Sequence, residues 1–169
     1  MAKTTTTTTT TNTNRRKNKY NVINRPFAGL LSNLVHATIG PNTIDYRYYA
    51  AVIVPAVNTS GTRKVGKFTI SISLPEDEAV LYWALIYVPK GYTVNVPFSE
   101  ADSLYEPSQH VLASGATDTN AGPCRIYSPL FKNLNGGDSI VCIIAARSST
   151  TITAATAYEG LCRYAICYN

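Results

Sequence analysis

The first 25 residues of this 169-residue chain contain no Asp and no Glu. The same segment holds six basic residues, whereas the rest of the chain holds nine basic and ten acidic residues. The formal net charge of +5 is therefore +6 in the segment and −1 in the remainder. The six basic residues are Lys3, Arg15, Arg16, Lys17, Lys19 and Arg25. A cationic segment joined to a near-neutral body is typical of a polyanion-binding tail, because Lys and Arg neutralise phosphates without reading bases.

The N-terminal segment also lacks an apolar face. Residues 4–11 are eight consecutive threonines, and polar and basic residues follow as far as Lys19. Without an uninterrupted apolar core, this segment is not a secretory signal peptide. We predict a disordered basic arm over residues 1–25 and a single folded domain over residues 26–169. The arm also fits two simpler roles, a solubilising tail or a nuclear-localisation patch.

Several chemical signatures are absent. No stretch approaches the about 20 apolar residues that a membrane span needs, so no membrane partner is expected. The cysteines, Cys124, Cys142, Cys162 and Cys167, lack CxxC spacing. We expect them to be small buried hydrophobic residues of a protein kept in a reducing compartment, rather than a zinc site or a disulfide framework.

The sequence also lacks the common catalytic motifs. No phosphate-binding loop, nucleophile elbow, HExxH or dinucleotide fingerprint is present. His36 and His110, the only histidines, lie on separate predicted strands with no carboxylate or cysteine at motif spacing. Asp138 follows an Asn-Gly-Gly turn signal, and its carboxylate is expected to accept hydrogen bonds from nearby backbone N–H groups. We therefore predict no enzyme activity, no catalytic residue and no cofactor.

What the chain does have is the periodicity of strands. In Lys67–Leu74 apolar residues alternate with polar ones, which predicts a strand with one buried face. Tyr46–Val54 and Val80–Val88 are more continuously apolar, as expected of strands covered on both faces or lying in a subunit contact. We predict eight strands, at about 34–40, 45–55, 66–74, 79–88, 108–117, 123–131, 137–146 and 157–168. Arg25–Leu34 is the one helical candidate.

Eight strands in one domain predict an all-β fold, either a two-sheet sandwich of jelly-roll type or a closed barrel. A long segment, residues 89–105, separates two of the strands, and such loops are usually functional or form an interface. Glu100, Asp102 and Glu106 lie in or beside it and are candidate ligands for an intersubunit cation. The simpler interpretation is a solvated acidic loop without a metal.

The chain holds twelve tyrosines and one tryptophan. Ordinary strand packing accounts for most of the tyrosines, and subunit contacts suit rings with a polar tip. A few that face a nucleic acid could also stack on unpaired bases. We expect Trp83, within the apolar run Val80–Val88, to be buried in the sandwich or at a subunit contact.

Three runs of the sequence carry a resemblance. They are VLYWALIYVPKG at 80–91, SLYEPSQHVLASGATD at 103–118 and CRIYSPLFKNLNGGDSIVCII at 124–144. In this order they resemble capsid proteins of small circular single-stranded DNA viruses that encode a replication initiator, the circovirus- and nanovirus-like groups. The resemblance covers roughly residues 30–168. The arm departs from the family, because Thr and Asn dilute its basic residues where such capsids often carry dense Arg/Lys tracts.

The resemblance implies an eight-stranded antiparallel jelly roll with an inward-facing basic arm. It also implies self-assembly into an icosahedral shell, with about 60 copies in the simplest (T=1) case. The six basic residues of the arm would then bind the packaged single-stranded DNA, in the virion and, during assembly, in the host nucleus. Three alternatives stay open: a lectin-like or trimeric jelly-roll binder, the capsid of an RNA satellite virus, and a nucleic-acid-binding protein that forms no shell.

Overall fold

The computed structural model describes residues 19–31, 33–39, 42–58, 60–73, 78–94, 110–118, 124–148 and 156–168. In these ranges the chain forms nine strands and no helix. They are β1 (Asn21–Leu31), β2 (Asn33–Ile39), β3 (Asn42–Val54), β4 (Arg63–Ser73), β5 (Glu78–Val88), β6 (His110–Asp118), β7 (Cys124–Leu134), β8 (Ser139–Ser148) and β9 (Thr156–Tyr168). The described residues accordingly hold no helix long and apolar enough to cross a membrane.

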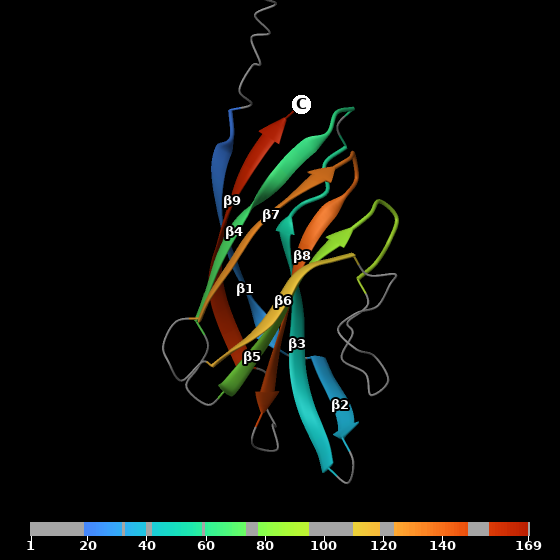
Figure 1. Ribbon diagram of the computed structural model, residues 1–169. Coiled ribbons are helices and arrows are strands. Elements are labelled where there is room, and N and C mark those ends of the chain that lie inside the picture. The colour runs from blue at the N-terminus through green and yellow to red at the C-terminus, as the bar shows by residue number, and fades with distance from the viewer. Residues whose placement is uncertain are drawn as a thin grey trace, which may run out of the picture.

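The strands form two antiparallel sheets (Figure 1). One sheet has the order β1-β9-β4-β7, and the other has the order β2-β3-β8-β5-β6. Without β2, eight strands remain. β1, β4, β7 and β9 form one sheet, and β3, β5, β6 and β8 form the other. This interleaving is the double Greek key of a jelly roll. The strand order therefore confirms the predicted eight-stranded antiparallel jelly roll and excludes the closed barrel.

The main core lies between the two sheets. Phe68, Ile70 and Ile72 of β4 are at most 2% exposed, whereas Lys67 and Ser73 are exposed, so the predicted alternation along β4 is confirmed. The residues that pack with them come from both sheets, among them Leu81 and Leu85 of β5 and Ile140 and Ile144 of β8.

A second apolar cluster lies on the far side of the five-stranded sheet. It contains Ala84, Ile86 and Val88 of β5 and Val141 and Ile143 of β8, with Val94 packed against it. Residues 140–146 of β8 are all buried, so both faces of this central strand are covered. The expectation of inner strands covered on both faces is confirmed for Val80–Val88.

The sequence analysis was wrong about the start of the domain. Asn21–Leu31 is a strand, β1, where a helix over Arg25–Leu34 was the candidate, and the predicted end of the arm at residue 25 falls inside this strand. β1 pairs along its whole length with β9, more than 120 residues later in the chain. Pro26 is tolerated because β1 is an edge strand with β9 as its one neighbour in the sheet.

Candidate nucleic-acid interface

The outward face of the β1-β9-β4-β7 sheet carries two rows of side chains that run across the strands. Backbone register places Val22, Ala165, Gly66 and Phe131 in one row. The next row along the strands contains Asn24, Arg163, Thr69 and Tyr127. Neighbouring strands are about 4.8 Å apart, so each row forms a continuous surface from β1 to β7.

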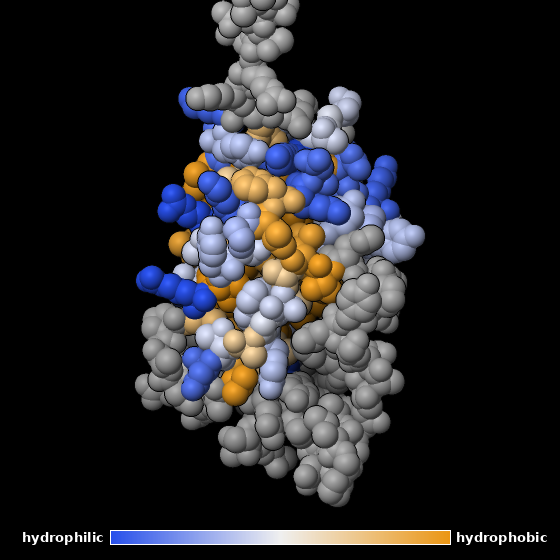
Figure 2. Space-filling model, in the orientation of Figure 1, coloured by the Kyte–Doolittle hydropathy of each residue, from blue (hydrophilic) through white to orange (hydrophobic). Residues whose placement is uncertain are grey.

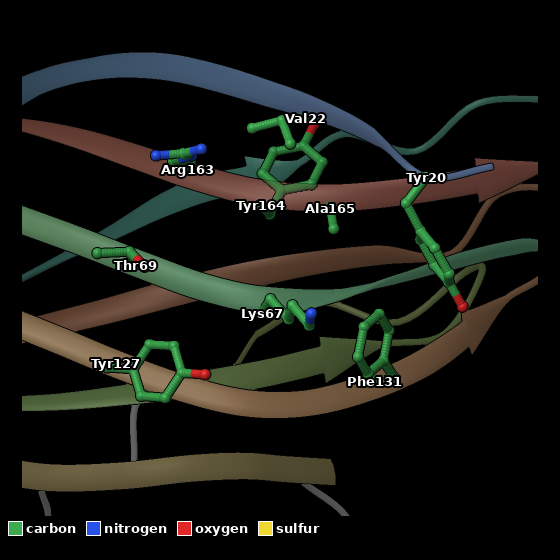
Figure 3. A pocket seen from close by; sticks show the side chains of 9 residues that line it. All are labelled: Tyr20, Val22, Lys67, Thr69, Tyr127, Phe131, Arg163, Tyr164 and Ala165. Carbon is green, nitrogen blue, oxygen red and sulfur yellow. The ribbon is translucent and has the colours of Figure 1, made fainter.

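A pocket of about 450 Å³ lies over these two rows (Figure 3). Lys67 points into it from β4, between the rows, with Tyr127 and Phe131 on the β7 side and Arg163 on the β9 side. The residues that line the pocket are Tyr20, Val22, Lys67, Thr69, Tyr127, Phe131, Arg163, Tyr164 and Ala165.

An irregularity in β4 shapes the pocket floor. Both neighbours of β4 change register at this point, between Gly66 and Phe68 in the pairing with β7 and between Gly66 and Thr69 in the pairing with β9. Lys67 has a φ of 53°, the only non-glycine residue with a positive φ in the described chain. A bulge re-aims the side chain that it carries. Here the exposed side chain of Lys67 points into the pocket.

Gly66 makes room for the aromatic wall. A Cβ atom added to Gly66 would lie 2.4 Å from the backbone oxygen of Leu130 and 2.5 Å from the ring of Phe131. The ring of Phe131 therefore lies directly over the backbone of Gly66. Only glycine permits this close approach.

Three of the four aromatic side chains that line the pocket are accessible to solvent, and the fourth, Tyr164, is buried. Tyr127 is 64% exposed, and Tyr20 and Phe131 are 37% exposed each. The rings of Tyr20 and Phe131 are 5.4 Å apart at a tilt of 56°, and the ammonium group of Lys64 lies 5.4 Å from the centre of the Phe131 ring. Large aromatic surfaces in such a position are typical of a binding face.

The pocket is also electropositive. Its nine lining residues include two cations, Lys67 and Arg163, and no carboxylate. Glu159 is the acidic residue of β9, four positions from Arg163 and therefore about 13 Å along the strand. The surface view shows hydrophobic residues in the middle of the visible face, with hydrophilic residues gathered towards the end where β1 begins (Figure 2). An apolar floor with cations and no acid favours an anionic ligand that has a flat apolar part.

The chain enters this face directly from the N-terminal side. Lys19 is exposed, and the next residue, Tyr20, lines the pocket and contacts Phe131. Lys3, Arg15, Arg16 and Lys17, the other expected phosphate-binding residues, lie outside the described residues, so their role stays a prediction.

Arg25 lies apart from the pocket. It is half-buried in the middle of β1, and its Cα partner on β9 is the buried Cys162. Burial raises the pKa of Cys162 to about 12, and the positive charge of Arg25 opposes this rise. Arg25 therefore belongs to the core-facing side of β1, with Phe27, and not to the face of Val22. The sequence placed Arg25 with the arm because it did not identify β1.

A second polar constellation is structural. The carboxylate of Asp138 accepts hydrogen bonds from the Tyr87 hydroxyl at 2.8 Å, the backbone N–H of Asn135 at 2.8 Å and that of Lys90 at 3.1 Å. Arg63, 2% exposed, donates to the backbone oxygens of Asp138 at 2.9 Å and Pro55 at 3.1 Å. The network joins the turn between β7 and β8 to the ends of β3 and β5. The prediction that Asp138 is a turn residue bonded to backbone N–H groups is confirmed.

The other candidate residues are not brought together. Cys124, Cys142, Cys162 and Cys167 are buried free thiols, as predicted. His36 lies in β2 and His110 in β6, at opposite edges of the five-stranded sheet. Glu100, Asp102 and Glu106 lie outside the described residues. Within the part of the chain that the structure describes, no group of three His, Cys, Asp or Glu side chains could hold a metal ion.

The pocket residues were not singled out from the sequence. Phe131, Tyr127 and Arg163 each stand in an ordinary alternating strand, and nothing in the local sequence shows that β7 and β9 flank the same strand. The signal that was present is Gly66-Lys67, because a glycine inside a strand pattern often marks a bulge or a close approach.

Comparisons with known proteins add the following findings. No protein-family model and no curated protein matches this chain. Among solved structures, it is similar to one of Mud crab tombus-like virus, with 11% identity, a TM-score of 0.36, and coverage of 94% of this chain and 95% of that one. It is also similar to structures of infectious bursal disease virus. For the Gx strain the identity is 8% and the TM-score 0.33, with coverage of 85% of this chain and 32% of that chain; for the Gt strain the values are 8%, 0.28, 86% and 36%. At these TM-scores the likenesses carry no argument, and the fold assignment rests on the strand order itself.

Proposed function

We propose that this chain is a viral coat protein whose jelly-roll body assembles into a closed shell and whose basic arm packages single-stranded DNA. The observation that carries the proposal is that the described chain begins beside the pocket. The chain enters β1 through Lys19 and Tyr20, at the pocket on the outward face of the β1-β9-β4-β7 sheet. Lys19, the exposed aromatic rings, Lys67 and Arg163 thus lie on one face of the subunit.

The charge distribution supports separate roles for the arm, which binds nucleic acid, and the body, which forms the shell. With the boundary at the start of the described chain, residues 1–19 hold five basic residues and no acid, and residues 20–169 hold ten of each. The body is formally neutral, so copies of it do not repel one another strongly when they are crowded into a shell. The arm supplies the whole +5 charge to the nucleic acid.

The jelly roll supplies the remaining support, together with the three capsid-like runs in the sequence. Two of these runs fall on β5 and on the β7-turn-β8 unit, which contains the Asp138 network. The simplest closed shell contains about 60 copies. We infer a T=1 particle with the β1-β9-β4-β7 face directed inward, and assembly in the host nucleus.

Expression of the full chain tests the proposal. A shell elutes near the void volume in size-exclusion chromatography, appears as uniform particles by negative-stain microscopy, and yields nucleic acid that DNase digests and RNase does not. Elution as a monomer or trimer would instead favour a soluble binder. RNase-sensitive cargo would keep the coat function and overturn the assignment to DNA.

A further inference from the structure

The pocket on the β1-β9-β4-β7 face has structural features that phosphate binding by charge attraction alone does not need. Phosphate binding needs cations alone, and a flexible arm already provides them. The body nevertheless holds one Lys in a left-handed conformation and places a phenyl ring over a glycine backbone to form this site. Strained backbone of this kind clusters at functional sites, because the surrounding structure must stabilise it.

We infer that this pocket binds an unpaired nucleobase of the packaged strand, stacked on Tyr127 and Phe131, with the adjacent phosphates held by Lys67 and Arg163. This inference rests on the proposed packaging function and names the part of the nucleic acid that the body recognises. Stacking on exposed aromatic rings in a cationic groove is the general mode of single-strand binding, and it tolerates any base because every base has a π-face.

The geometry suits a single strand better than a duplex. The aromatic surface lies on β7, and the two cations lie on the adjacent β4 and the next strand, β9, so the anionic and flat parts of one nucleotide meet different strands of the sheet. In a duplex the base faces are stacked inside the helix and cannot reach the ring of Tyr127. The pocket therefore discriminates by strandedness rather than by sequence.

Tyr20 connects the pocket to the arm. Its ring contacts Phe131, and the chain on its N-terminal side continues through Lys19 into the basic arm. A strand whose phosphate binds Lys19 is therefore close to the aromatic wall.

The test uses the full chain and two oligonucleotides of equal length, one of thymidines and one abasic, which carry the same phosphates. The parent protein is expected to bind the thymidine strand about tenfold more tightly, the effect of one stacked base, and to show no such gain for a duplex. Tyr127→Ala should bring the ratio close to one, whereas Tyr127→Trp should keep it. Tyr92→Ala is the matched control, because Tyr92 is 72% exposed and lies outside the pocket.

A second variant distinguishes packaging by the arm from base binding in the pocket. It replaces Arg15, Arg16, Lys17 and Lys19 by Ala. It should weaken binding of both strands by the same factor and leave their ratio unchanged. Equal binding of the two strands by the parent, or a preference that survives Tyr127→Ala, overturns the pocket assignment while the packaging function stands. If the parent binds neither strand, the packaging function fails and the pocket assignment fails with it.

Discussion

The hydroxyl of Tyr87 on β5 donates a hydrogen bond of 2.8 Å to the carboxylate of Asp138, which lies 51 positions later in the turn before β8. The carboxylate accepts two further hydrogen bonds from backbone N–H groups. Because Asp138 is 4% exposed, these donors replace the water that an ionised carboxylate needs. The contact ties the end of β5 to the β7–β8 turn.

Tyr87→Phe should lower the free energy of unfolding by about 1.5–3 kcal/mol, since it removes one hydrogen bond to a charged group and leaves the ring in place. Urea denaturation followed by circular dichroism measures the change. Tyr127→Phe, at a side chain that is 64% exposed, is the matched control. If the two variants lose equal stability, the contact with Asp138 has no special role.

The same pair predicts how stability depends on pH. Burial alone would raise the pKa of Asp138, but hydrogen bonds from Asn135, Tyr87 and Lys90 and the charge of Arg63 hold it below its ordinary value of 3.8. A carboxyl with a lowered pKa in the folded state stabilises the fold above the unfolded pKa, and this stability is lost as the pH falls below about 4.

At the other end of the range, burial and Asp138 raise the pKa of Tyr87 from 10.0 to about 12. This contribution is complete below pH 10 and is lost between pH 10 and 12. Unfolding measured from pH 2 to 12 should show both slopes. Asp138→Asn should flatten the acid slope and Tyr87→Phe the alkaline one; unchanged slopes would contradict this assignment.

The bulge of β4 predicts that substitutions at Gly66 and at Lys67 change the stability of the protein in opposite directions. Gly66→Ala should destabilise the protein, by about 1–3 kcal/mol as for other overpacked sites, because the new methyl group meets the backbone oxygen of Leu130 as well as the Phe131 ring. Lys67→Gly should raise the melting temperature slightly, because glycine adopts the φ of 53° without a Cβ penalty. Differential scanning calorimetry of both variants measures these effects. A stabilising Gly66→Ala would show that the floor of the pocket is not close-packed.

Trp83 provides a prediction for the core. Its indole is half-buried and packs against the main core, which confirms the expected contact with the sandwich but not complete burial. Trp83→Ala should cost about 3 kcal/mol, the lower end of the range for aromatic residues, because part of the ring stays solvated. In the parent protein the fluorescence of this single Trp should be only partly quenched by iodide. Complete quenching would contradict the packing.

The sequence predicted most of the fold because most strands carry their own periodicity. The alternation from Phe68 to Ile72 and the apolar run of β5 are local patterns, and both lie where the sequence placed them. β1 was missed because polar and apolar residue types do not alternate along its sequence, although burial alternates from Asn24 to Leu31, and because its pairing partner, β9, is remote in sequence. For the same reason the pocket could not be foreseen, since Phe131, Lys67 and Arg163 meet only through the strand order.

The residue at which β1 begins determines which N-terminal truncation removes the arm without damaging the folded body. Removal of residues 1–18 leaves β1 complete, whereas removal as far as residue 25 takes away the first five residues of the strand and exposes the edge of β9 from Cys162 to Ile166. The shorter truncation should keep the melting temperature of the parent, and the longer one should lower it. Equal melting temperatures would mean that the β1–β9 pairing over Asn21–Arg25 contributes no stability.

Substitution of Arg15, Arg16, Lys17 and Lys19 by Ala tests the arm with the whole chain in place. Binding to single strands should be steeply salt-dependent in the parent, and the slope of log K against log salt should fall by about 3 in the variant, near 0.7 for each lost charge. In the proposed T=1 shell of about 60 copies, the five arm cations of each chain would amount to about 300 charges, so shells of the variant should hold less nucleic acid. Shortening the threonine run should have little effect, because an uncharged spacer only sets the reach of Lys3. A quadruple variant that packages as much nucleic acid as the parent, judged by its absorbance ratio, would reduce the arm to a localisation signal or a solubilising tail.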